Sequence, residues 1–418
     1  MSEWRELTLG EVMTLQRGFD LPSQDRKPGI VPIISSSGVS GYHSNSCVRG
    51  PGVVTGRYGT IGKVFLIKED YWPLNTTLWV KDFHGNDPEF ASFLLRTIDF
   101  QSFSDKSSVP GVNRNDLHQV PILLPPLHEQ KAIAHILGTL DDKIDQLRKT
   151  NTVLEDMASA LFKSWFVDFD PVKAKQENRP TGLPKDLDDL FPDSFEDSAL
   201  GPIPTGWRVG RLRDYVRISK GVSYKSSELA PSNTALVTLK SFHRGGGYRA
   251  DGVKSYTGKF KPDQQVLSDD LVVAYTDVTQ DALVIGKPAR VIADSEYSTL
   301  VASCDVGIVR PVSEVFTTAY LYELFLTSDF QNHIYGHSSG TTVLHLSATG
   351  VQSYETHIAP EQLMTQFSVV ANDAFAKKKS NIHQIRILTN LRDTLLPKLI
   401  SGDLRVPEAE QMVAELGL

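Results

Sequence analysis

The sequence predicts a mixed fold of the α/β (α+β) class, in which two globular domains are separated by two long antiparallel helices that form a coiled coil. A helix entry followed by a long apolar repeat occurs at Pro126 and again at Pro360, 234 residues later. The blocks that close these helices, at Leu161 and Leu395, have the same separation. The globular segments before the helices differ in sequence. The chain is therefore predicted to be a pseudo-two-fold internal repeat.

The two copies also begin alike. A tryptophan, a leucine and a glycine recur 203 residues apart, at Trp4 and Trp207, Leu9 and Leu212, and Gly18 and Gly221. Since the helices are 234 residues apart, the second domain is expected to hold 31 extra residues. The predicted parts are 1–125 (first domain), 126–168 (first helix), 169–206 (linker), 207–358 (second domain), 359–403 (second helix) and 404–418 (C-terminal tail).

Strand and helix signals are mixed within both domains. The expected strands are 53–55, 64–67, 77–80, 235–239, 271–275, 283–285 and 305–309, and the expected helices are 87–96 and 318–334. The linker is acidic and rich in proline and glycine, so we expect no regular structure in it.

Apolar residues recur along the first helix in alternating steps of four and three. They are Ile133, Leu137, Leu140, Ile144, Leu147, Leu154, Ala158, Leu161 and Trp165, with Asn151 as the one polar member. This spacing predicts a coiled-coil seam in which Asn151 is a candidate for fixing register or partner. The second helix is less regular, and Pro397 is expected to end or kink it. A plain helical hairpin in a single core is the alternative.

Composition narrows the class of protein. A chain of 418 residues can form two or three domains, and its two cysteines, Cys47 and Cys304, argue against a disulfide framework or a cysteine-based zinc site. We expect neither a signal peptide nor a membrane span, and a reducing, cytoplasmic setting. The net charge is −7, but residues 207–261 hold 12 Lys and Arg against three acidic residues. Such a stretch, interleaved with aromatics, suits contact with nucleic-acid phosphates or an ordinary solvated basic face.

Catalytic motifs are not found. The loop Gly56–Lys63 resembles a phosphate-binding loop, but Arg57 and Val64 stand where glycine and a hydroxyl residue are needed, so a turn between strands is expected. His128, Glu129 and His135 lack the spacing of a zinc-protease helix. Asp168–Pro171 is an incomplete form of the tetrapeptide with which amino-methyltransferases hold a base. These failures favour a binding protein without catalytic, cofactor or metal sites of its own.

Several blocks, in the same order along the whole chain, resemble the DNA specificity subunit of type I restriction-modification systems. The most specific runs from Leu161 to Val172, and the others are 4–11, 123–130, 190–195, 200–207 and 395–402. The second helix entry departs from the family pattern, with Ala359 in place of the first proline.

The resemblance implies a non-catalytic subunit in which two target-recognition domains each read half of a bipartite site on double-stranded DNA. The helices would act as spacer and as dock for two methyltransferase (modification) subunits. Those partners would bring S-adenosylmethionine, and motor-nuclease (restriction) subunits, with ATP and Mg, could join them.

Side-chain chemistry predicts the DNA-contacting residues, which we expect in loops beside strands and glycines. In the first domain they are Ser35, Ser36, Ser37, Tyr42, His43, Arg57, Tyr58, Lys106, Ser107, Asn113, Arg114 and Asn115. In the second they are Lys220, Tyr224, Lys225, Lys240, His243, Arg244, Tyr248, Arg249, Tyr275, Thr276, His337, Ser338 and Thr341. For each, an ordinary solvated loop residue is the alternative. For the whole chain, the alternatives are a structural adaptor that does not read DNA and a nuclease or methyltransferase with a divergent site.

Overall fold

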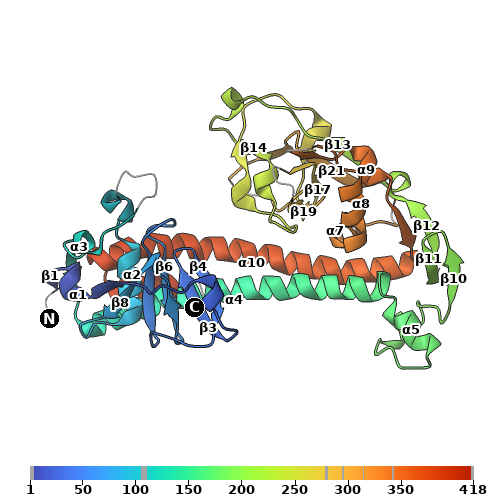
Figure 1. Cartoon of the computed structure of the whole chain (residues 1–418). Coiled ribbons are helices and arrows are strands. Elements are labelled where there is room, and N and C mark those ends of the chain that lie inside the picture. The colour runs from blue at the N-terminus through green and yellow to red at the C-terminus, as the bar shows by residue number, and fades with distance from the viewer. Residues whose placement is uncertain are drawn as a thin grey trace. The chain divides into compact units, whose positions relative to one another are not determined.

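The computed structural model describes residues 4–104, 111–277, 281–293, 296–313, 315–340 and 343–415. The chain forms two compact units (Figure 1). Unit 1 comprises Met1–Arg148 and Ile382–Leu418, and unit 2 comprises Lys149–Asn381. The longest elements, α4 (Leu127–Phe166) and α10 (Glu361–Ser401), contribute residues to both units. Among the described residues, no helix is long and apolar enough to span a membrane.

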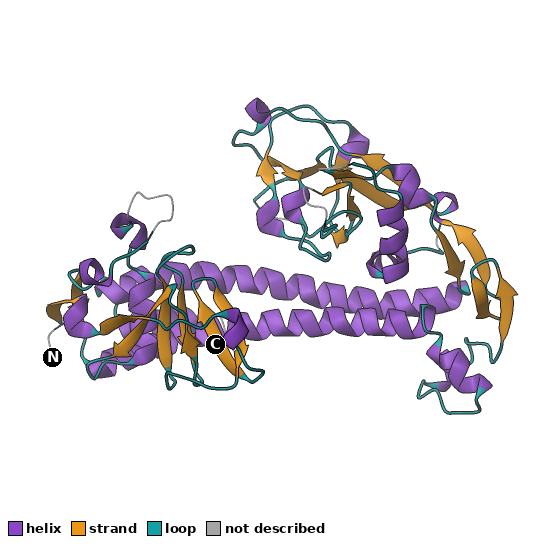
Figure 2. Cartoon of the chain, in the orientation of Figure 1, coloured by secondary structure: helices purple, strands orange, loops and turns teal. Residues whose placement is uncertain are grey.

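Residues 4–124, which we call the first reader, contain two sheets of three or four strands and a separate pair of strands. Figure 2 shows these strands with short helices around them. One is an antiparallel sheet of order β2 (Thr14–Arg17), β8 (Thr77–Asp82), β5 (Gly52–Gly56) and β6 (Val64–Ile67). The other has the order β4 (Gly38–His43), β3 (Val31–Ser35) and β7 (Trp72–Pro73), and β1 (Arg5–Thr8) pairs with β9 (Pro121–Leu124). The helices are α1 (Leu9–Val12), α2 (Pro88–Arg96) and α3 (Arg114–Leu117).

Residues 207–358, the second reader, repeat this plan. The antiparallel sheet is β13 (Val216–Lys220), β21 (Val306–Pro311), β17 (Leu271–Ala274) and β19 (Pro288–Arg290). The second sheet is β15 (Lys254–Ser255), β14 (Thr234–Val237), β20 (Thr299–Ala302) and β16 (Gln265–Val266), and the end pair is β12 (Arg208–Arg211) with β23 (Glu355–Ile358). A further pair joins β18 (Thr276–Asp277) and β22 (Leu344–His345), and the helices are α7 (Thr318–Leu326), α8 (Ser328–Gly336) and α9 (Ala348–Gln352). In both readers the four strands of the antiparallel sheet have the spatial order first, fourth, second, third, so the internal repeat is confirmed in the fold.

Gly18 and Gly221, the glycines at matched positions, are required for the same structural reason in both readers. A Cβ atom on Gly18 would lie 2.2 Å from the carbonyl oxygen of Leu74, and one on Gly221 would lie 2.1 Å from that of Ser303. The next residues, Phe19 and Val222, form parallel bridges to the same two partners. Only glycine lets the backbones approach this closely, which explains why the position recurs.

The extra residues of the second reader are concentrated at one place. β14 begins 37 residues before β17, whereas the equivalent strands β3 and β5 begin 21 residues apart, so 16 of the 31 extra residues lie here. This interval contains much of the basic stretch, including Lys240, Arg244 and Lys261.

α4 and α10 pack against each other antiparallel, as predicted. Within unit 1, Arg392 of α10 donates to Asp141 of α4 (2.7 Å). Within unit 2, Asn381 donates to the side-chain oxygen of Asn151 (2.8 Å), and both residues are buried. The single polar seam position is therefore satisfied by another asparagine, and a pair of this kind specifies register.

Two local predictions are wrong, and a third is wrong in part. Residues 283–285 form a turn, because the Asp277 carboxylate accepts hydrogen bonds from the backbone N–H groups of Val284 and Ile285. The expected helix 318–334 is two helices, since Thr327 has an extended backbone and caps α8. Pro397 was expected to end or kink α10, and it does not end it, because α10 continues to Ser401 and its last turns bury Leu395 and Leu399 in the core of unit 1.

The linker was also expected to lack regular structure, and this is wrong. It holds α5 (Asp170–Gln176), α6 (Lys185–Asp188) and a hairpin of β10 (Phe195–Ser198) and β11 (Gly201–Pro204). Its Phe169 packs edge-on against Trp207 (5.5 Å between centroids), and Phe191 against Trp165 (5.5 Å). The aromatic residues thus order a segment that its proline and glycine content alone would leave irregular.

Candidate nucleic-acid interface

Three segments of the first reader meet around the loop that follows β5. Tyr58 forms an antiparallel bridge with Gly111, and the backbone N–H of Val112 donates to the carbonyl of Arg57 (3.1 Å). The Arg57 guanidinium lies over the Tyr58 ring, 4.5 Å from its centroid. A cation and an aromatic face are thus presented together on the surface, a pairing suited to phosphate and base contacts.

The turn of residues 35–37 borders the same loop. The Ser35 hydroxyl donates to the carbonyl of Gly38 (2.9 Å) and lies 3.0 Å from the Ser37 hydroxyl, and these two contacts close the turn. The Ser36 Oγ lies 3.5 Å from where a Cβ on Gly59 would be. The loop itself joins strands β5 and β6, so the expected turn between strands is confirmed for Gly56–Lys63.

The third segment is the start of α3. The Asn113 side chain caps this short helix by accepting from the backbone N–H of Asn115 (3.0 Å). Asn113, Arg114 and Asn115 are all exposed. The structure therefore brings together Ser35–Ser37, Arg57, Tyr58 and Asn113–Asn115, whereas Lys106 and Ser107 lie outside the described residues.

The other two candidates of the first reader lie elsewhere. Tyr42 is 58% exposed at the end of β4 away from the serine turn. His43 is buried, accepts from the backbone N–H of Lys27 through Nδ1 (2.9 Å) and packs edge-on against Trp72. A histidine held in this way supports the fold, so we leave it out of the interface.

In the second reader, Lys220, Lys225, Lys240, His243 and Arg244 are exposed. His243 and Arg244 are presented by a tight loop in which Gly245, Gly246 and Gly247 all have positive φ (89°, 115° and 95°). The loop is held in place by backbone bonds from Gly245 to the Leu283 carbonyl (3.0 Å) and from Gly247 to the Pro288 carbonyl (2.8 Å). Arg249 has a two-point ion pair with Asp251, which neutralises it.

The remaining candidates among the described residues are buried, half-buried or held by contacts with neighbouring groups. Tyr248, Tyr275 and Thr276 are buried, and burial raises the pKa of the Tyr275 hydroxyl far above its ordinary value. Tyr224 is half-buried against the small cluster around Tyr256. His337 stacks on His333 (4.0 Å), and Ser338 donates to the Ile334 carbonyl at the end of α8 (2.8 Å). Thr341 lies outside the described residues.

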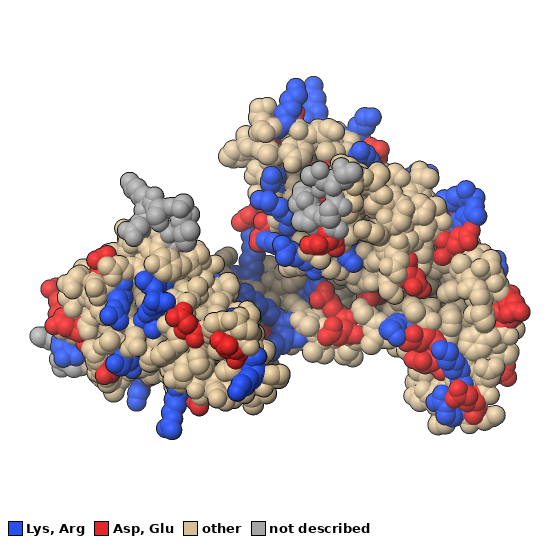
Figure 3. All heavy atoms as spheres, in the orientation of Figure 1, with Lys and Arg blue, Asp and Glu red and all other residues tan. Residues whose placement is uncertain are grey.

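The basic stretch 207–261 leaves several cations without a carboxylate partner. Arg211, Arg213 and Arg249 pair with Glu355, Asp214 and Asp251. Within the described ranges, no carboxylate lies within 4.0 Å of the exposed cations Lys220, Lys225, Lys240, Arg244, Lys259 and Lys261. Figure 3 shows Lys and Arg side chains along the part of unit 2 that carries the β14 label in Figure 1.

Lys259 and Lys261 were not among the predicted contacts, although both lie in the basic stretch 207–261. Arg290 and Glu323, which join the second reader to the helices, were also missed. Nothing in their sequence surroundings sets them apart, since their roles depend on contacts with residues far along the chain. Over the described part of the chain, no group of three or more His, Cys, Asp and Glu side chains is placed to hold a metal ion.

Comparison with known proteins gives three results. Residues 1–156 match the family model described as type I restriction modification DNA specificity domain. The chain is 27% identical over 358 residues to the type I restriction enzyme MjaIX specificity subunit of Methanocaldococcus jannaschii, covering 83% of this chain and 76% of that protein. It is 22% identical to the type I restriction enzyme HindI specificity subunit of Haemophilus influenzae, covering 97% and 100%.

Among solved structures, the fold is similar to that of the S subunit of a type I restriction-modification system from M. genitalium. The TM-score is 0.60 at 16% identity, with 95% of this chain and 96% of that chain covered. At this identity the likeness concerns the fold, and it extends to both readers and both helices.

Proposed function

Because this chain belongs to the family of type I restriction-modification DNA specificity subunits, we propose that each of its readers recognises one half of a bipartite site on double-stranded DNA. The observation that carries the proposal is the repeat itself. Two readers have the same sheet order and the same glycine contact, but their exposed loops differ in length and sequence. Two domains with the same sheets but different surface loops are suited to the recognition of two different half-sites.

The first half-site would be read by the surface formed by residues 35–37, Arg57, Tyr58 and 113–115. The second would be read from the exposed cations Lys220, Lys225, Lys240 and Arg244 together with His243. Backbone phosphates supply most of the affinity for such basic loops, and base edges supply the sequence preference.

The chain would act without catalysis of its own, in the cytoplasm. α4 and α10 would set the distance between the readers and dock two methyltransferase subunits, which bring S-adenosylmethionine and methylate adenine. Motor-nuclease subunits with ATP and Mg could complete a restriction complex. No cofactor would be bound by this chain.

The test is to express the chain with its methyltransferase in a host without adenine methylation and to map the modified adenines. The proposal predicts one bipartite sequence with an unspecified spacer of fixed length, and no label transfer from S-adenosylmethionine by the chain alone. Unmodified DNA in the presence of a folded complex would favour a structural adaptor. Transfer by the chain alone would favour a divergent enzyme.

A further inference from the structure

Two groups of contacts attach the second reader to the helices within unit 2, and Lys379 of α10 adds polar contacts to Ser268 (2.9 Å) and Asp269 (3.8 Å). The first is an aromatic cluster in which Tyr320 of α7 packs against Phe162 and Phe166 of α4, both 5.0 Å between centroids. Phe367 of α10 completes it, 5.4 Å from both phenylalanines. Apolar contacts of this kind are strong but weakly directional, so alone they would permit the reader to pivot.

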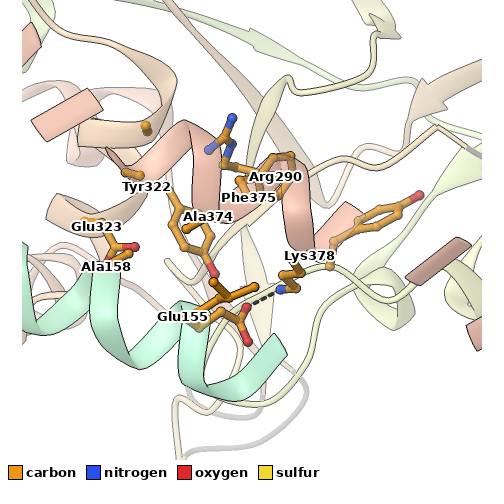
Figure 4. A pocket seen from close by; sticks show the side chains of 12 residues that line it. Glu155, Ala158, Arg290, Tyr322, Glu323, Ala374, Phe375 and Lys378 are labelled. Carbon is orange, nitrogen blue, oxygen red and sulfur yellow. Dashed lines mark hydrogen bonds and ion pairs between the residues drawn. The ribbon is translucent and has the colours of Figure 1, made fainter. Parts of the chain in front are cut away.

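The second attachment lies about two turns further along α10. Arg290, at the end of β19, places its guanidinium over the ring of Phe375, 3.7 Å from the centroid (Figure 4). Its Nη2 donates to the side-chain oxygen of Asn372 (3.0 Å). Phe367 and Phe375 are eight residues apart, which is about 12 Å along a helix.

A carboxyl group of α7 adds a contact to α4 in the same place. Glu323 is 5% exposed and accepts a hydrogen bond from the Ser159 hydroxyl (2.7 Å). Glu155 and Lys378 join α4 to α10 by an ion pair beside it (Figure 4). Glu323, Glu155 and Lys378 line a cavity of about 30 Å³, which is enough for one or two water molecules.

Burial of the Arg290 charge lowers the free energy of unfolding, so stability alone does not explain why an arginine stands here. Arg290 is 7% exposed, its Nε has no hydrogen-bond partner, and no carboxylate of the described residues lies within 4.0 Å of its guanidinium. A buried charge with so few partners destabilises the fold relative to an apolar residue of similar size. An arginine at this position instead constrains orientation. The planar guanidinium must stack on the ring of Phe375 and donate to the Asn372 amide oxygen within the guanidinium plane.

We propose that Arg290, held by Phe375 and Asn372, is a positioning residue that fixes the angle of the second reader on the helices and so the length of the DNA spacer. This inference rests on the proposed function. A reader of about 150 residues extends roughly 30 Å from its attachment. A tilt of roughly 7° at the aromatic cluster would move its far surface by about 3.4 Å, the rise of one base pair.

The experiment uses Arg290→Met in the full complex with the methyltransferase. Methylation rates are measured on DNA with the chain's own half-sites and spacers of native length, one base pair shorter and one longer. The preference for the native spacer should fall at least tenfold, while the half-site sequences stay the same. Asn372→Ala, which removes only the hydrogen-bond acceptor of Arg290, should also lower the preference for the native spacer, but by less. It serves as the test if Arg290→Met does not fold.

Arg310→Met is the matched control. Arg310 pairs with Asp270 inside the second reader (2.6 Å) and has no hydrogen bond or ion pair to α4 or α10 among the described residues. The neighbouring Ser268 and Asp269 contact Lys379 of α10, and the substitution keeps both of these side chains. It should lower stability but leave the spacer preference unchanged. An unaltered preference in Arg290→Met and Asn372→Ala, or an equal loss in Arg310→Met, would overturn the inference. If the unaltered chain directs no methylation of a bipartite site, the proposed function itself fails.

Discussion

Glu323 is an ionisable residue of α7 that lies almost completely inside unit 2. Burial disfavours its charged form and raises the pKa of its carboxyl from 4.5 to about 7, although the hydrogen bond from Ser159 acts in the opposite direction. Between pH 4.5 and pH 7 the folded chain therefore holds a proton that the unfolded chain has lost. The stabilising effect of this proton is lost as the pH rises through the folded-state pKa.

Glu323→Gln should remove this pH dependence. The amide keeps an acceptor for Ser159 but never ionises, so the variant should exceed the unaltered chain in free energy of unfolding by about 3 kcal/mol at pH 8. The difference should vanish below pH 4.5, where the carboxyl is protonated in both the folded and the unfolded chain. Urea unfolding at pH 5 and pH 8 measures it. Glu410→Gln, at an exposed position of α11 (Val406–Ala414), is the control and should show the same stability difference at both pH values.

A substitution of the single residue Arg244 tests whether the second reader contacts DNA phosphates. It is exposed on the glycine loop and has no carboxylate partner among the described residues. If it meets a phosphate, Arg244→Ala should lower the slope of log affinity against log salt by about 1 without changing the preferred sequence. Binding titrations at several salt concentrations measure both. Arg213→Ala, whose charge is already paired with Asp214, should leave the slope nearly unchanged.

At the residue scale, chemistry alone predicted the candidate site incompletely. Arg57, Tyr58 and Arg244 were chosen by side-chain type and prove to be on the surface. His43 and Tyr275 were chosen by the same rule and are buried, because a sequence does not show which side of a short strand or loop faces the core. Periodicity could not help, since the strands of the readers are only two to six residues long.

At the element scale, the long helices were predictable and the linker was not. The seam of α4 follows from a local pattern, and Ile133, Leu137, Leu140 and Ile144 are all buried as it requires. Two aromatic contacts order the linker: Phe191 packs on Trp165 of α4, and Phe169 packs on Trp207, the residue before β12. Both contacts join residues that are far apart in the sequence. Local composition therefore gave the wrong answer there.

Lengthening both helices tests whether they act as a ruler. A heptad inserted after Leu147 and another after Ile382 keeps the seam in phase, and both points lie at the boundary between the two units. Each helix then grows by roughly 10 Å. The unspecified spacer should increase by roughly one to three base pairs, at about 3.4 Å each, with both half-sites unchanged.

Mapping of methylated adenines measures the outcome of these insertions. A two-residue insertion at the same two points is the control, because at about 100° per residue it turns the following part of each seam away from its partner and should abolish the complex instead of lengthening the spacer. An unchanged spacer in a folded, active heptad variant would mean that the bound methyltransferases set the distance.

The whole molecule is an internal repeat in which the sheets and the long helices are alike and the exposed loops differ. The 234-residue offset of the helices and the matched glycines made this plan visible in the sequence. The equivalence of the two sheets was not visible, because it lies in pairing order and not in residue identity. The central claim is that each reader acts as an independent module.

Exchange of one reader is the most direct measurement of this claim. Residues 207–358 are replaced by the matching segment of another specificity subunit with a known site, and methylated adenines are mapped in the complex with the methyltransferase. The account predicts that the second half-site changes to that of the donor while the first half-site stays the same. A change in both halves, or in neither, with the complex folded and active, would contradict it.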